Sequence, residues 1–187
     1  MKRVFCGLAA ALLMPLAAMG QDAAQPAATA PAQMEANPVS NHVRQILDRE
    51  SKLITAAVEE MPAEKYSYHP TPEQMTFAHM VLHMANTNNF LCSAISGMAV
   101  PKSDAISDTD SKDKLVAALK SSFDFCTTAL ANVDDSKLGE QLKLGQRTMS
   151  RAGVMITLTD DFYDHYSTAA VYLRLNGLLP PSAQPKK

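Results

Sequence analysis

The sequence predicts an all-α fold, a four-helix bundle, for the region after its leader. Three observations favour it: four long segments carry apolar residues at three-and-four spacing, helix caps and breakers bound these segments, and none shows the alternation of a strand. The chain has 187 residues, enough for one domain with a proper core. It contains no internal repeat.

Residues 1–20 have the organisation of a secretory signal peptide. Lys2 and Arg3 form a basic start, an apolar run follows from Val4 to Ala17, and small residues precede a cleavage site expected before Gln21. The run is short for a transmembrane helix, and no other segment approaches the length of a membrane span. We therefore expect an exported protein, periplasmic or secreted, with no stable membrane span after processing; an uncleaved anchor is the alternative.

Residues 21–38 are rich in Ala, Pro and Gln and lack apolar periodicity, which is typical of a flexible, disordered linker. The helical domain is expected to cover 39–182, and a short tail 183–187 follows it. Removal of Lys2 and Arg3 changes the formal net charge from −2 to −4. A mildly acidic protein gives no electrostatic reason to expect a nucleic acid as partner.

Two cysteines, Cys92 and Cys126, remain after removal of the leader. An exported protein meets an oxidising compartment, so the two could form a disulfide. The sequence does not show their separation, and two small buried apolar side chains without a bond are the slightly favoured alternative.

The first helix is expected over Asn41–Met61. Ser40 or Asn41 can cap it, and Pro62 prevents its continuation. Its inward stripe consists of Val43, Ile46, Leu47, Leu53, Ile54, Ala57, Val58 and Met61.

The second helix is expected to end at about Ser96, before Gly97. Either Thr71 or Thr76 could cap its start. Its buried face consists of Phe77, Met80, Val81, Met84, Asn88, Leu91, Cys92 and Ile95.

The third helix is expected over Ser111–Val133 and the last over Ser150–Asn176, ending at Gly177. Residues 134–149 are expected to form a long connection. The long connectors after the first and third helices permit a topology other than simple up-and-down.

The candidate site lies on the last helix. Asp161 and His165 interrupt its inward stripe, one turn apart on the same face, and burying an unpaired charge is expensive. A metal ion is one suitable partner, and another histidine is the natural third ligand. On an ideal wheel His83 lies about 120° from the centre of the buried stripe of the second helix, and His79 about 160°. His83 is therefore the better candidate, and His79 is expected to face water.

A structural polar network is the alternative to a metal. In that interpretation His83 bonds a backbone carbonyl or a carboxylate, and Asp161 and His165 form a buried couple joined by Tyr163 or Arg174. The sequence contains no phosphate-binding glycine loop, nucleophile elbow or zinc-ribbon cysteine spacing.

Three stretches of the domain resemble the DinB-like four-helix bundle proteins. They are Met61–Tyr66 with Pro70–Glu73; Thr76-Phe77 leading to His83-Met84-Ala85-Asn86, Asn88 and Phe90-Leu91-Cys92; and His165-Tyr166 leading to Tyr172–Gly177 and Pro180-Pro181-Ser182. Many members of that family bind a divalent metal through three histidines, one on the second helix and two on the last. His83 and His165 match the first and last of these positions.

Asp161 stands where the family has its other histidine, and Ser167-Thr168 replaces a glycine-glutamine pair. Asp can bind zinc, nickel or iron through oxygen, so the resemblance implies a His83-Asp161-His165 site for one of these metals. It further implies a metal-dependent hydrolase or thiol transferase acting on a small molecule, and a homodimer. The alternative function is a non-catalytic binding or interaction module that keeps the bundle and has lost the metal.

Overall fold

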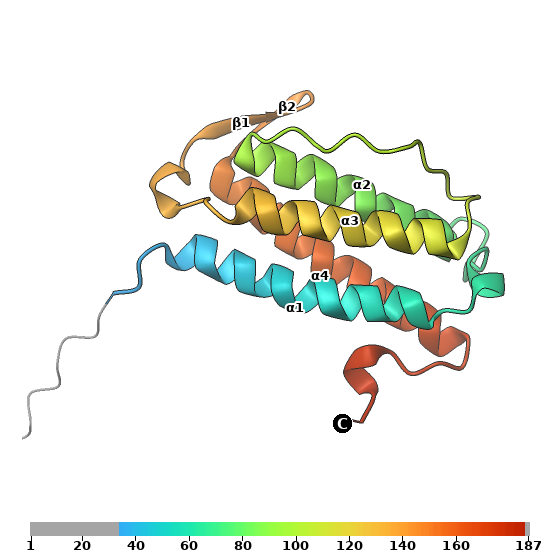
Figure 1. Cartoon of the computed structure of the whole chain (residues 1–187). Coiled ribbons are helices and arrows are strands. Elements are labelled where there is room, and N and C mark those ends of the chain that lie inside the picture. The colour runs from blue at the N-terminus through green and yellow to red at the C-terminus, as the bar shows by residue number, and fades with distance from the viewer. Residues whose placement is uncertain (1–33, 186–187) are drawn as a thin grey trace, which may run out of the picture. The chain divides into compact units, whose positions relative to one another are not determined.

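The structure is a computed structural model that describes residues 34–185, and four long helices form most of it (Figure 1). They are α1 (Pro38–Glu60), α2 (Phe77–Ser96), α3 (Lys112–Leu130) and α4 (Arg151–Leu175). The smaller elements are the 3-10 helices η1 (Ala63–Lys65), η2 (Asp135–Lys137) and η3 (Pro181–Ala183) and the strands β1 (Gln141–Leu144) and β2 (Arg147–Ser150). The predicted all-α four-helix bundle is confirmed. The predicted signal peptide at 1–20 and the linker up to residue 33 lie outside the described residues. Among the described residues no helix is long and apolar enough to span a bilayer.

Helix α1 begins earlier than predicted, because Pro38 occupies its first turn, where the missing amide proton costs nothing. The predicted caps are wrong, since neither Ser40 nor Asn41 caps the helix with its side chain. Asp135 of η2 accepts the orphan backbone amides instead, at 2.9 Å from Val39 and 2.8 Å from Ser40, and also the Ser40 hydroxyl at 2.6 Å. The cap lies 95 positions away in the sequence, so no local pattern could reveal it.

This cap predicts a pH-dependent loss of stability in Asp135→Ala. Partial desolvation would raise the pKa of the Asp135 carboxyl, but hydrogen bonds from Ser40 and Val39 outweigh it and hold that pKa below its usual value. A carboxyl group whose pKa is lower in the folded than in the unfolded state stabilises the fold at pH values above its unfolded-state pKa. That stabilisation is lost as the pH falls through its folded-state pKa. Asp135→Ala should therefore lower the melting temperature at pH 7, and the difference from wild type should shrink between about pH 5 and pH 2.

Thermal unfolding followed by circular dichroism measures both effects. Asp124→Ala, on the exposed side of α3, is the matched control and should change little at either pH. An equal loss at both pH values would show that the charged carboxylate is not the source of the stabilisation.

The other helix ends agree better with the sequence. Thr76, not Thr71, caps α2, and its hydroxyl accepts the His79 amide at 3.1 Å. The helix ends at Gly97, whose φ of +77° is the left-handed conformation that glycine adopts freely. The last helix was predicted to begin at Ser150, and in the structure Ser150 caps α4 by accepting the Gly153 amide with its hydroxyl.

The connection from α3 to α4 contains a hairpin that the sequence analysis did not predict. Strands β1 and β2 pair antiparallel, with Leu142 opposite Met149, and Gly145 supplies the positive φ of +60° in the turn. The long connection expected over 134–149 therefore contains local structure of its own. Each strand has only four residues, too few for an alternation that rises above chance.

Helices α2 and α3 run parallel (Figure 1). Asn88 is hydrogen-bonded to Ser122 and Cys92 is disulfide-bonded to Cys126, and the two residues of each pair have the same separation in the sequence. Residues 97–111 return the chain along the length of the bundle between them. The full-length crossover therefore follows the second helix, not the two connectors that the sequence analysis singled out.

Helices α1 and α4 also run parallel to each other and antiparallel to the α2–α3 pair. Arg49 of α1 contacts Tyr163 of α4, and Arg44 near the start of α1 reaches the carbonyl of Leu130 at the end of α3. Phe77, the first residue of α2, lies next to Tyr172, near the end of α4, so these two helices run in opposite directions. This antiparallel pair of α2 and α4 holds the candidate site.

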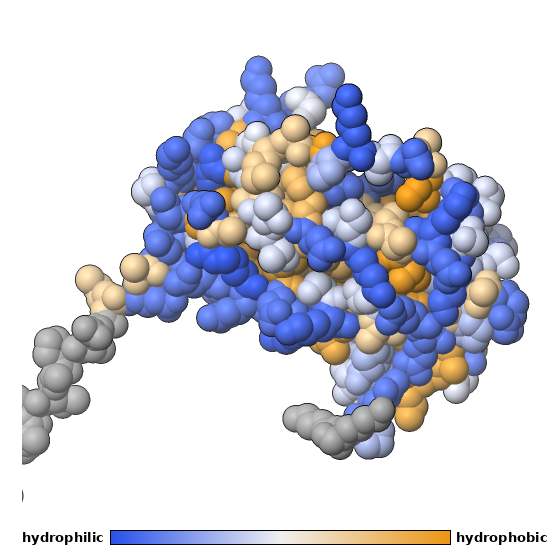
Figure 2. Space-filling model, in the orientation of Figure 1, coloured by the Kyte–Doolittle hydropathy of each residue, from blue (hydrophilic) through white to orange (hydrophobic). Residues whose placement is uncertain are grey.

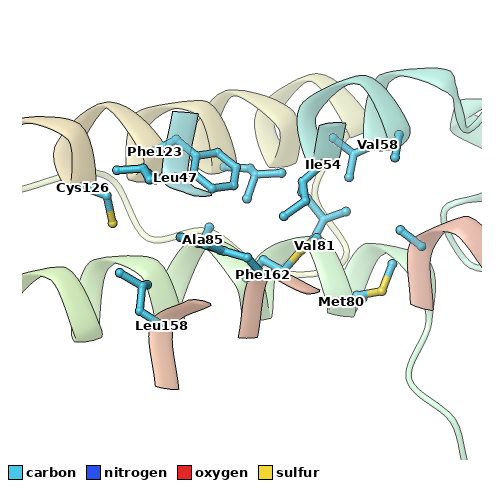
Figure 3. Packing of buried hydrophobic residues seen from close by; sticks show 14 of the residues in the cluster. Leu47, Ile54, Val58, Met80, Val81, Ala85, Phe123, Cys126, Leu158 and Phe162 are labelled. Atoms are coloured by element: carbon cyan, nitrogen blue, oxygen red, sulfur yellow. The ribbon is translucent and has the colours of Figure 1, made fainter. Parts of the chain in front are cut away.

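The four predicted stripes meet in one core. Figure 3 shows Leu47, Val81, Phe123 and Phe162, one from each helix, in this cluster, and Phe123 packs on Phe162 with ring centroids 5.8 Å apart. Hydrophilic side chains cover most of the face that α1 and α3 present in Figure 2, with smaller apolar areas between them.

Cys92 and Cys126 form a disulfide between α2 and α3, with Cα atoms 5.2 Å apart. The slightly favoured prediction of two unbonded thiols is therefore wrong, although both side chains are fully buried as expected. The parallel register of α2 and α3 brings the two residues together, and this register is a property of the crossover that spacing in the sequence does not show.

Candidate metal centre

The antiparallel packing of α2 against α4 brings His83 opposite Asp161 and His165. One potential ligand atom from each of the three residues lies within 4.8 Å of the other two. The imidazole rings of His83 and His165 have centroids 5.0 Å apart and an interplanar angle of 35°. The three residues that the sequence nominated from separate helices therefore form one group.

The spacing of these atoms fits a metal ion after side-chain adjustment. Tetrahedral ligand atoms at about 2.0–2.2 Å from one ion lie about 3.3–3.6 Å from each other. Separations up to 4.8 Å close to this range with side-chain shifts of about 1 Å. His83 is exposed, so its ring has room for that rotation.

The orientation of His165 is fixed by a backbone hydrogen bond. Its Nδ1 lies 2.8 Å from the carbonyl oxygen of Asp161, which can only accept, so Nδ1 carries the proton in the neutral ring. The lone pair is then on Nε2. Metal-binding histidines are commonly oriented by such a bond from the other ring nitrogen, so the His165 ring is oriented to bind a metal ion through Nε2.

Asp161 places a largely buried negative charge in the group. Burial raises the pKa of the Asp161 carboxyl, and the charges of His165 and His83 oppose that rise only partly. Its side chain is 16% exposed, and its one ion-pair contact within residues 34–185 is with His165 Nδ1, at 3.5 Å. A carboxylate without a lysine or arginine partner in this setting is stabilised by a bound cation.

His83 forms the solvent side of the group. Its Nε2 lies 3.4 Å from the Thr87 hydroxyl, one turn further along α2. His79 points elsewhere and bonds the carboxylate of Asp108 at 2.9 Å, which confirms that it faces outward.

The polar network proposed as the alternative lacks its two suggested members. Tyr163 bonds Arg49, and the guanidinium of Arg174 lies 3.4 Å from the carbonyl of Ala170. Neither side chain joins Asp161 to His165, so the group contains His83, Asp161 and His165 without them.

Helix α1 carries a buried charge that was not predicted from the sequence. Glu50 is 2% exposed and accepts a hydrogen bond from Arg49 at 2.8 Å. It occupies the inward stripe, three residues after Leu47 and four before Ile54, and that position was the available signal.

Comparisons with known proteins agree with this fold. A crystal structure of a DinB-like protein from Bacillus subtilis superposes with a TM-score of 0.62 at 18% identity, covering 78% of this chain and 100% of that one. A DinB-like protein from Bacillus cereus gives 0.62 at 17%, covering 75% and 95%, and a conserved protein from Enterococcus faecalis gives 0.56 at 15%, covering 73% and 96%. No curated protein matches the chain significantly.

The sequence itself matches a family model, that of the DinB superfamily, over residues 46–169. This span begins in α1 and ends in α4, so it contains most of the bundle and all three residues of the candidate centre. The chain therefore belongs to the DinB superfamily.

Proposed function

We propose that the protein is an exported metal-binding member of its superfamily, with His83, Asp161 and His165 as the ligands of one divalent ion. The observation that carries this proposal is the convergence of three potential ligand atoms from two helices within 4.8 Å. Two imidazoles and one carboxylate suit zinc, nickel or iron.

The proposed activity is metal-dependent hydrolysis or thiol transfer on a small molecule. Three protein ligands would leave at least one coordination position of the ion open, and an ion held by them would act as a Lewis acid and favour the deprotonated form of a water or thiol. The residues of the chain prepare that position: His165 is held by its backbone bond, and Asp161 supplies the negative charge. The exposed side of His83 is the approach for a substrate.

Export is supported by two independent features. Residues 1–20 have signal-peptide organisation, and the Cys92–Cys126 disulfide is a bond that persists in oxidising compartments and is rare in the cytosol.

The test is metal analysis of the purified wild-type protein after separate incubation with zinc, nickel and iron(II) and removal of free metal. We expect about one equivalent of one metal per chain, with apparent affinity falling as the pH is lowered from 7.5 to 5.5, because histidine must be neutral to bind. Absence of stoichiometric metal under all three conditions would instead favour the non-catalytic binding module.

A further inference from the structure

A cavity of about 320 Å³ lies between the segment that joins α2 to α3 and the outer faces of these two helices. This crossover segment, residues 97–111, runs along the length of both helices (Figure 1). Its middle part, residues 99–106, makes no hydrogen bond to either helix within residues 34–185. It contacts the bundle through the apolar side chain of Ile106, and the cavity is the space left beneath it.

The two ends of the crossover segment are held by polar contacts. Near α2, the hydroxyl of Ser93 donates a hydrogen bond to the carbonyl of Met98 at 2.6 Å. Near α3, the carboxylate of Asp108 lies 2.9 Å from Nδ1 of His79. A segment fixed at both ends keeps its middle in place without filling the space under it. The cavity is therefore a preformed concave site of the kind that small molecules occupy.

Small and apolar side chains form the floor of the cavity. Helix α2 presents Ala85 there, and α3 presents Ala118. Longer side chains at these two positions would reach the crossover segment, so the alanines are the reason for the hollow. Leu82 and Phe125 complete the floor, which offers an apolar surface to the C–H groups of a ligand.

Polar side chains without internal partners line the same cavity. They are Asn86 and Asn89 of α2 and Ser121 of α3. None of these three side chains has a hydrogen-bond partner within residues 34–185. An amide or hydroxyl group both donates and accepts, whereas a carboxylate only accepts and an ammonium group only donates. Hydroxyl groups on a ligand are therefore the best match for these side chains.

The crossover segment adds one charge of each sign to the wall of the cavity. These are Lys102 and Asp104, and neither makes an ion pair in the part of the chain that the structure describes. A cleft lined by charges of one sign attracts ions of the other sign. Here the two charges balance, so the site favours a neutral ligand.

We propose that this cavity binds a neutral sugar. One face of a pyranose ring carries C–H groups and packs on the apolar floor around Phe125, while hydroxyl groups at the ring edge bond Asn86, Asn89 and Ser121. A volume of about 320 Å³ is at the lower end of the range for small-molecule sites, about 300–1,000 Å³, so the cavity takes one ring. The same chemistry is offered by a free monosaccharide and by the terminal ring of a glycan.

The sugar site is separate from the candidate metal centre. At about 100° per residue, Ala85 and Asn89 point about 160° and 120° away from His83 on α2. None of His83, Asp161 and His165 lines the cavity. The proposal therefore does not depend on a bound metal.

Saturation-transfer difference NMR of the purified full chain tests the proposal, with glucose, galactose, mannose and N-acetylglucosamine as probes. The wild type should transfer saturation to at least one of them. Titration should give a dissociation constant of about 0.1–10 mM, the range for a ligand of about twelve non-hydrogen atoms. Lactose and cellobiose distinguish the two sources: a site for free sugar rejects the second ring, and a site for a glycan end binds it at least as well.

Substitutions in the cavity place the sugar. Ala118→Leu fills the floor and should weaken binding at least tenfold, whereas Ala117→Leu, the next position on α3 and exposed, is the matched control and should bind normally. The double variant Asn86→Ala with Asn89→Ala keeps the cavity open but removes two polar partners, and it should also weaken binding about tenfold or more. His83→Ala should bind the sugar as the wild type does.

Absence of saturation transfer to all four sugars at about 20 mM would overturn the proposal. So would binding that Ala118→Leu and the double asparagine variant both leave at the wild-type level, or binding that is lost in His83→Ala. If Ala118→Leu does not fold, as judged by circular dichroism, the double asparagine variant decides alone, because its two side chains make no hydrogen bond within residues 34–185.

Discussion

His165→Ala is expected to abolish stoichiometric metal binding, lowering the apparent affinity by a factor of about 100 or more. The substitution removes one of three protein ligands, and even the loss of a group that only orients a ligand costs about 10- to 100-fold. Isothermal titration calorimetry with zinc and metal analysis after dialysis measure the loss. His79→Ala is the matched control: this histidine is one turn from His83 on α2, bonds Asp108, and should leave binding unchanged.

Two substitutions of Asp161 should act in opposite directions on metal affinity. Asp161→His should strengthen binding, because a third imidazole restores the ligand set that the resemblance implies for related proteins. Asp161→Asn should lose the metal and yet stabilise the metal-free protein by about 1 kcal/mol, the usual scale of a single stabilising substitution. The gain in stability follows from the raised pKa of the Asp161 carboxyl. The folded state binds this proton more tightly than the unfolded state, so the ionised carboxylate lowers the free energy of unfolding as the pH rises through the unfolded and then the folded pKa.

These results separate the metal centre from a structural network. If His165→Ala loses stability while the metal content stays at the wild-type level, or if the wild type holds no metal and Asp161→His does, the centre described here is not a working site in this protein.

Removal of the Cys92–Cys126 disulfide is expected to cost about 3–4 kcal/mol of unfolding free energy. The bond closes a loop with a sequence separation of 34, and the chain-entropy relation gives this magnitude for a loop of that length. Urea unfolding of the wild type and of the double variant Cys92→Ala with Cys126→Ala measures the difference.

The same bond gives a test of export. The chain contains three cysteines, and Cys6 lies within the predicted signal peptide. Protein recovered from the cell envelope and denatured without reductant should therefore begin at Gln21 and contain no thiol that a labelling reagent can modify. Soluble cytoplasmic protein that retains Met1 and labels at two or three thiols would contradict export.

The parts of the fold that depend on local sequence were predictable. Periodicity located all four helices. Thr76 was one of the two caps considered for α2, and the last helix was predicted to begin at Ser150, because a cap contacts amides within three residues of itself. Asp161 and His165 were recognisable because they share one turn of one helix. His83 required only its angle on α2 and the resemblance of the surrounding residues to a known family.

The features that were missed depend on how distant elements pack. Asp135 caps a helix 95 residues earlier in the chain, and Cys92 meets Cys126 only because α2 and α3 run parallel. Glu50 is a different case, since its place in the inward stripe of α1 was visible in the sequence. A charged residue at such a position indicates a polar contact that the fold must supply, here with Arg49.

If the proposed centre binds an ion, its division between α2 and α4 determines when and where the protein acquires that ion. About half of the described domain separates His83 from Asp161, and α4 is synthesised after the other three helices. A growing chain therefore cannot hold the ion with all three ligands, and a chain that crosses a membrane unfolded arrives without it. For an exported protein, the choice among zinc, nickel and iron is then made by the metals available outside the cytoplasm, and not by the supply inside the cell that made the chain.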